Sequence, residues 1–183
     1  MTECIALIRG INVGRAKRIA MADLREVVAG LGTRNVRTVL NSGNVIFQAQ
    51  RPNLSKLALA IEAGLVKRCG FSAAVVVITA ADLDAIIVAN PLRSAARDHA
   101  RYLVAFASGP TVLSTAKPLL KEAWAPDALA IGARAAYVWC ANGMLESKLL
   151  KALTRLTGES VTTRNWATVL KLQAAAADSA GQA

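Results

Sequence analysis

"VRTVLNSGNVIFQA", residues 36–49, contains two β-rich runs separated by a short polar turn. Valine, isoleucine, threonine and phenylalanine favour strands, whereas asparagine, serine and glycine favour tight turns. The stretch is therefore predicted to form a β-hairpin. This hairpin decides the fold class, because helix-forming segments precede and follow it.

The segments on either side of the hairpin complete a strand–helix–strand–strand–helix–strand order. Before it, a buried strand is expected at 4–8 and a helix at 21–32. After it, a helix is expected at 53–70 and a continuous apolar strand at 73–78, followed by a short capped helix at 79–90. This order is the split βαββαβ pattern of ferredoxin-like units.

The second half of the chain repeats the order. Strands are expected at 102–107 and 159–163, a hairpin at 129–140, and helices at 115–124, 145–158 and 164–172. We therefore expect an α+β fold with two ferredoxin-like (βαββαβ) halves, mainly antiparallel sheets and a C-terminal helix. The expected domains are 1–92 and 93–172, with the join near 93–101 and a flexible tail at 173–183.

Composition limits the class of protein. The 183 residues are 54% hydrophobic and 19% charged, which is typical of a folded chain, and the net charge is +10. Residues 1–92 and 93–183 each carry 11 Lys or Arg and 6 Asp or Glu, so the excess is evenly spread. A spread positive charge favours anionic partners such as nucleotides or nucleic acid, and also occurs on ordinary proteins.

Cysteine and histidine are scarce. The three cysteines are far apart and His99 is the only histidine, which argues against a metal site and favours a cytoplasmic protein with reduced thiols. No cofactor is expected. The apolar run 73–81 is much shorter than the roughly 20 residues of a membrane span, and no signal peptide or membrane partner is expected.

The loop after the first strand is rich in glycine and cations. "LIRGINVGRAK", residues 7–17, matches neither GxGxxG nor GxxxxGK[ST], so it is no established nucleotide motif. Glycines let backbone N–H groups approach a phosphate, so the loop is either an anion site or a basic turn. Its candidate residues are Arg9, Gly10, Asn12, Gly14, Arg15 and Lys17.

Two further polar turns stand out. The hairpin turn offers Ser42, Gly43 and Asn44, which either shape the turn or contact a ligand. "TTRNW", residues 162–166, lies where a strand meets a helix. There Arg164 is a candidate anion ligand, Asn165 a candidate cap or ligand, and Trp166 a core residue or stacking platform.

With RGINVG, SGN and TRNW in this order, the chain resembles the DUF1697 family of uncharacterised bacterial proteins over residues 4–172. The resemblance implies an α+β fold with ferredoxin-like halves, and it brings no activity, substrate or cofactor. Family members often have Gly-Gly where this chain has Gly14-Arg15, glutamine in place of Asn41, and a polar residue in place of Ala167.

The resemblance suggests that the three polar turns converge. The resulting hypothesis is one pocket for a nucleotide, phosphorylated metabolite or carboxylate. In it, Arg9 and Arg164 neutralise the anion, Asn12, Ser42 and Asn44 orient it, and Trp166 walls the site. No base or nucleophile stands out, so no catalytic residue is nominated and enzymatic activity stays open. The alternatives are a nucleic-acid-binding module and a structural or interaction protein without a ligand; the oligomeric state is unknown.

Overall fold

The computed structural model describes residues 1–14, 16–93 and 98–180. Its contacts divide the chain into unit 1, Met1–Ala81 with Lys171–Ala183, and unit 2, Asp82–Leu170. Helices α3 (Ala80–Val88) and α6 (Trp166–Ala180) each contribute residues to both units. The expected boundary at 92/93 falls after α3, and the expected join at 93–101 lies partly outside the described residues.

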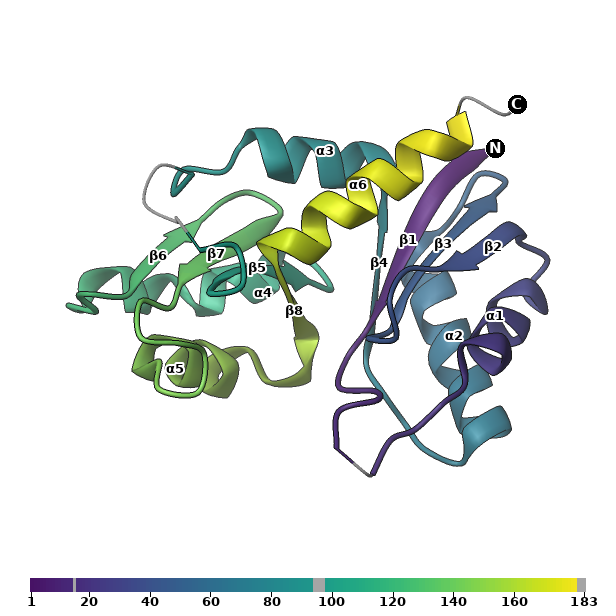
Figure 1. Ribbon diagram of the computed structural model, residues 1–183, viewed down its shortest axis with the longest axis horizontal. Coiled ribbons are helices and arrows are strands. Elements are labelled where there is room, and N and C mark those ends of the chain that lie inside the picture. Colours follow the sequence, from purple (N-terminus) through teal and green to yellow (C-terminus); the bar gives the residue numbers. More distant parts are fainter. Residues whose placement is uncertain (15, 94–97, 181–183) are drawn as a thin grey trace. The chain divides into compact units, whose positions relative to one another are not determined.

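Unit 1 contains a four-stranded antiparallel sheet with the strand order β2-β3-β1-β4. Its elements are β1 (Thr2–Ile8), α1 (Met21–Ala29), β2 (Arg34–Thr38), β3 (Asn44–Ala49), α2 (Leu54–Cys69) and β4 (Val75–Thr79). Figure 1 shows α1 and α2 on the same face of this sheet. The predicted hairpin is the β2–β3 pair, and the βαββαβ order of this half is confirmed.

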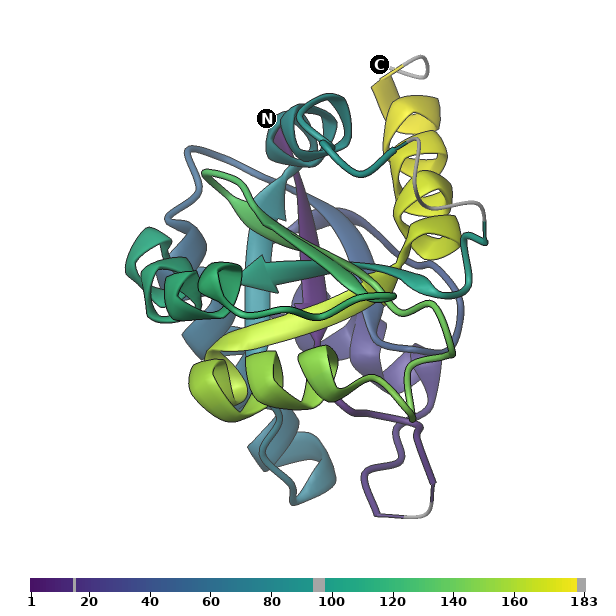
Figure 2. The ribbon, with the colours of Figure 1, turned by 90° about the vertical axis from the view of Figure 1, so that its left-hand side faces the viewer.

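Unit 2 repeats the topology with the strand order β6-β7-β5-β8. Its elements, beside part of α3 and α6, are β5 (Tyr102–Ala107), α4 (Pro110–Thr115), η1 (Lys117–Lys121), β6 (Ala128–Ile131), β7 (Ala135–Trp139), α5 (Lys148–Thr157), η2 (Gly158–Ser160) and β8 (Val161–Asn165). Figure 2 shows the green β6–β7 hairpin beside the teal strand β5. The prediction of two ferredoxin-like halves is confirmed.

Two of the helix predictions were wrong. The helix expected at 115–124 is replaced by the short α4 and the 3₁₀ helix η1. Pro118 prevents α4 from continuing through this segment, because proline lacks an N–H and its ring clashes with the carbonyl one turn earlier in an α-helix. The helix expected from residue 145 begins at Lys148, so Leu145 lies outside the helix and is exposed.

The last helix is longer than expected. α6 continues to Ala180, so residues 173–180 are helical and not a flexible tail. The segment is rich in alanine, which has the highest helix propensity of any residue. Residues 181–183 lie outside the described part of the chain.

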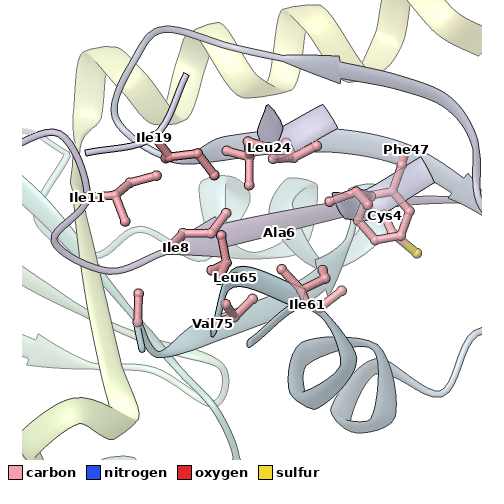
Figure 3. Close-up of a cluster of buried hydrophobic side chains, with 14 of the residues drawn as sticks. Cys4, Ala6, Ile8, Ile11, Ile19, Leu24, Phe47, Ile61, Leu65 and Val75 are labelled. Carbon is pink, nitrogen blue, oxygen red and sulfur yellow. The ribbon is translucent and has the colours of Figure 1, made fainter. Parts of the chain in front are cut away.

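Each unit packs its helices over one sheet face through an aliphatic core. In unit 1, Figure 3 shows Ile11 and Ile19, from the two arms of the loop after β1, beside Ile8 and Leu24 in this cluster. A Cβ on Gly64 of α2 would lie 2.6 Å from Cγ1 of Val27, so a glycine is needed where α1 and α2 cross. The core of unit 2 is built in the same way from β5, β7, α4 and α5.

The opposite face of each sheet is also buried. Ile5 and Leu7 of β1 are fully buried, as is Phe106 of β5, while Tyr102 is 1% exposed. Burial on both faces explains why these strands read as continuous apolar runs. The first strand of the predicted hairpin forms the edge strand β2. No helix of the described residues has the length and apolar character needed to cross a membrane.

Candidate functional site

The loop between β1 and α1, residues 9–20 (the β1–α1 loop), is held in shape by Asn12. The Ile19 N–H donates to Asn12 Oδ1 at 3.0 Å, and Asn12 Nδ2 donates to the Ile19 carbonyl at 3.0 Å and the Asn41 carbonyl at 2.9 Å. The Asn12 N–H also donates to the Lys17 carbonyl at 2.7 Å. The side chain of Asn12 therefore forms its hydrogen bonds with backbone atoms, and these bonds stabilise the conformation of the loop.

The turn between β2 and β3, residues 39–43 (the β2–β3 turn), is closed by Asn44. The Val39 N–H donates to the Asn44 carbonyl at 2.9 Å, and Asn44 Nδ2 donates to the Val39 carbonyl at 2.9 Å. Asn44 Nδ2 also donates to Ser42 Oγ at 3.1 Å. Asn44 is fully buried, so it shapes the turn from inside.

The loop and the turn are in direct contact. Besides the bond from Asn12 to Asn41, the Ile8 N–H donates to the Gly43 carbonyl at 2.8 Å. A Cβ on Gly43 would lie 2.9 Å from Ile11 Cγ1 and 3.0 Å from the Ile8 carbonyl oxygen, and Gly43 has φ +78°. Only glycine fits this point without strain. Two of the three predicted turns thus form one polar corner of unit 1.

The dihedral angle φ alternates in sign over residues 10–14 of the β1–α1 loop. Gly10, Asn12 and Gly14 have φ of +65°, +55° and +69°, whereas Ile11 and Val13 between them have negative φ. Left-handed residues of this kind occur in the backbone nests whose neighbouring N–H groups bind anions. Among the described residues, no hydrogen bond uses the N–H of Gly10, Val13 or Gly14, and all three residues are exposed.

The β1–α1 loop also carries several cations. Arg9 and Lys17 are half-buried, and exposed Arg18 donates from Nε to the Gly14 carbonyl at 3.2 Å. Arg15 lies outside the described residues. Neither residues 4–22 nor residues 27–61 contain an acidic side chain. The corner therefore presents positive charge and N–H donors without carboxylates from its own chain segments.

The TRNW segment lies in unit 2, and its Arg164 and Trp166 side chains are buried. Arg164 is 8% exposed and donates from Nη1 to Thr162 Oγ1 at 2.9 Å and the Thr163 carbonyl at 2.8 Å. Burial in a medium that solvates charge poorly lowers the pKa of Arg164 to about 10. Within its own strand, the Arg164 guanidinium therefore donates to neutral oxygen atoms.

The two residues after Arg164 also have internal contacts. Asn165 Oδ1 accepts a hydrogen bond from the Thr168 N–H at 2.9 Å, the geometry of a helix N-cap on α6. Trp166 is buried, and its ring lies 5.4 Å from that of Tyr102, tilted by 41°. The first two predicted turns meet in unit 1 and the third belongs to unit 2, so the three-turn pocket stays a prediction.

Sequence reasoning missed several residues of the two units. In the corner of unit 1 these are Val13, Arg18 and Leu40, of which Arg18 was detectable as one more cation of "RAKR". In unit 2, Asn90 Oδ1 accepts hydrogen bonds from the Tyr102 hydroxyl and the Leu92 N–H. No sequence pattern connects these residues, because their contacts depend on the folded backbone.

Among the described residues, the cysteines and the potential metal ligands form no second candidate site. Burial raises the pKa of the Cys69 and Cys140 thiols, which makes them poorer nucleophiles than a solvated cysteine. Across the described ranges, no three His, Cys, Asp or Glu side chains gather where they could hold a metal ion. The unit 1 corner is therefore the candidate site that the geometry supports best.

Comparisons with known proteins agree with this architecture. The conserved bacterial protein SP0830 from Streptococcus pneumoniae is similar in structure, with a TM-score of 0.78 and 23% sequence identity over 96% of this chain and 98% of that one. At this identity the likeness shows the fold alone. No curated protein matches the chain. A family model described as "Protein of unknown function (DUF1697)" matches residues 1–137, and the chain therefore belongs to the DUF1697 family.

Proposed function

We propose that this protein binds a small anionic ligand at the corner formed by the β1–α1 loop and the β2–β3 turn. The observation that supports it most is the alternating backbone of residues 10–14, which leaves exposed N–H groups on a loop fixed from behind by Asn12. A preformed donor array loses little conformational entropy when it binds, so its hydrogen bonds contribute more to affinity.

The donors and cations of the corner favour a ligand with negative charge. Its donors are backbone N–H groups, the ammonium of Lys17 and the guanidinium of Arg18, which suit the oxygens of a phosphate or carboxylate. Residues 9–20 and 39–43 include no Asp, Glu, His or Cys. The proposal is therefore one of recognition, because these segments supply no general base or thiol.

Calorimetric titration with inorganic phosphate and with a nucleoside triphosphate tests the proposal. Saturable binding is expected, and the double variant Lys17→Ala/Arg18→Ala weakens it at least about tenfold, since a hydrogen bond to a charged group contributes roughly 1.5–3 kcal/mol. The matched control is Lys148→Ala/Lys151→Ala on α5 of unit 2, which removes the same charge elsewhere and leaves the affinity within about twofold.

Two outcomes overturn the proposal. The first is the absence of saturable binding by any phosphate or carboxylate tested. The second is equal weakening by both double variants, which would indicate a response to net charge alone. Retention on nucleic acid with a steep salt dependence would support the polyanion alternative instead. The rings of Tyr102 and Phe106 on β5 are 1% and 0% exposed, so they offer no surface for base stacking.

A further inference from the structure

We propose that the ligand of the unit 1 corner is an organic anion whose apolar group contacts Val13 and Leu40. The inference rests on the proposed function, and it narrows the ligand class from any small anion to an alkyl or aryl phosphate or carboxylate. An inorganic ion offers no apolar surface to these two exposed side chains.

Both apolar side chains are exposed to solvent. Val13 is 73% exposed and Leu40 is 44% exposed. Single exposed apolar residues are common on protein surfaces and need no explanation. These two, however, lie in the two segments that form the proposed anion site, one in each.

A hydrogen bond connects the two segments that carry Val13 and Leu40. Asn12 Nδ2 donates to the Asn41 carbonyl at 2.9 Å. Val13 follows Asn12 and Leu40 precedes Asn41 in the chain, and consecutive Cα atoms are about 3.8 Å apart. Val13 and Leu40 therefore each lie one residue away from the hydrogen bond that joins the loop to the turn.

The backbone of Leu40 gives a second, independent observation. Leu40 has φ +60°, a left-handed conformation that is unfavourable for a bulky L-residue and easy for glycine or asparagine. Residues held in such conformations cluster at ligand sites, where the strain keeps a side chain in a required place. Here the strained residue holds an exposed leucine beside the anion loop.

The neighbouring turn supplies a donor of the right kind. Ser42 Oγ accepts a hydrogen bond from Asn44 Nδ2 at 3.1 Å, and Ser42 is exposed. The hydroxyl hydrogen of Ser42 therefore points away from Asn44, toward solvent or a ligand acceptor. A ligand with several acceptor oxygens and an attached apolar group would match both the donors and the two exposed side chains.

Calorimetry with three probes tests the inference: inorganic phosphate, methyl phosphate and phenyl phosphate. We expect phenyl phosphate to bind about tenfold more tightly than inorganic phosphate, with methyl phosphate in between, because burial of apolar surface adds to affinity. Leu40→Gly should reduce this preference about fivefold without changing the affinity for inorganic phosphate. The substitution also relieves the left-handed strain, so thermal unfolding is expected at the wild-type temperature or above it.

Val13→Ser is the second variant, and Leu145→Ser is the matched control. Leu145 is 84% exposed in unit 2, so its replacement should leave the preference unchanged. Equal affinity for inorganic and phenyl phosphate would overturn the inference and leave the proposed function standing. A preference unaffected by both Leu40→Gly and Val13→Ser would also overturn it. Failure of all three probes to bind would overturn the proposed function itself.

Discussion

The polar segments of the two units use the same kinds of residue in opposite ways. In unit 1, Asn12 and Asn44 bind the backbone from inside and leave exposed N–H groups on the β1–α1 loop. In unit 2, Arg164, Asn165 and Trp166 are themselves occupied, by strand oxygens, a helix cap and a ring contact. A run of residues typical of ligand sites can therefore be structural, while a glycine loop keeps its donors available.

The two units also differ in net charge. Unit 1 carries 12 Lys or Arg and 5 Asp or Glu, whereas unit 2 carries 10 and 7. The two sequence halves divided at 92/93 have equal charge only because Asp82 and Asp84 precede that point. In the structure both residues belong to unit 2. The larger positive excess therefore lies in the unit that contains the candidate anion site.

The largest effect expected from this comparison comes from Arg164. Arg164→Ala should lower the free energy of unfolding by about 4 kcal/mol, because it leaves a cavity and removes the donor from buried oxygen partners. Arg18→Ala, at an exposed cation of the β1–α1 loop, should cost less than about 0.5 kcal/mol. Urea denaturation followed by circular dichroism measures both values. Similar small losses for the two variants would contradict the structural role of Arg164.

A smaller loss is expected at the contact between the loop and the turn of unit 1. Gly43→Ala should cost about 3 kcal/mol, because the new Cβ meets Ile11 and the Ile8 carbonyl and the residue has positive φ. Gly10→Ala is the matched control: it also has positive φ, but its Cβ meets nothing within 4 Å, so about 1 kcal/mol is expected. Urea denaturation of both variants isolates the effect of close packing, and equal losses would refute it.

The sequence predicted most of the fold because both halves follow strong local rules. Continuous apolar runs marked β1, β4 and β5, and the turns "NSGN" and "GAR" marked the two hairpins. The failures were also local: Pro118 stops an α-helix, and an alanine-rich end extends one. The role of β2 as an edge strand was missed, because strand order depends on pairing between distant segments.

The candidate site was only partly predictable. The sequence identified Asn12 and Asn44 as polar candidates, but not that their amides would face the backbone. It also left Leu40 out, since a left-handed leucine follows from the closure of the turn by Asn44 and not from its own propensity. Residue type predicted where polar groups gather, whereas the hydrogen-bond partners decided which of them a ligand could reach.

The smallest effect concerns two asparagines with the same contact in different units. Asn165 Oδ1 accepts from the Thr168 N–H at 2.9 Å, and Asn53 Oδ1 accepts from the Lys56 N–H at 3.0 Å. If both are only helix caps, Asn165→Ala and Asn53→Ala should each cost about 1 kcal/mol, and the aspartate variants should retain most of the stability. Urea denaturation gives these values, and the phosphate titration is repeated on each variant. A ligand role for Asn165 would instead appear as weaker phosphate binding in Asn165→Asp with stability retained, while Asn53→Asp binds normally. That result would contradict a role of Asn165 as a helix cap alone.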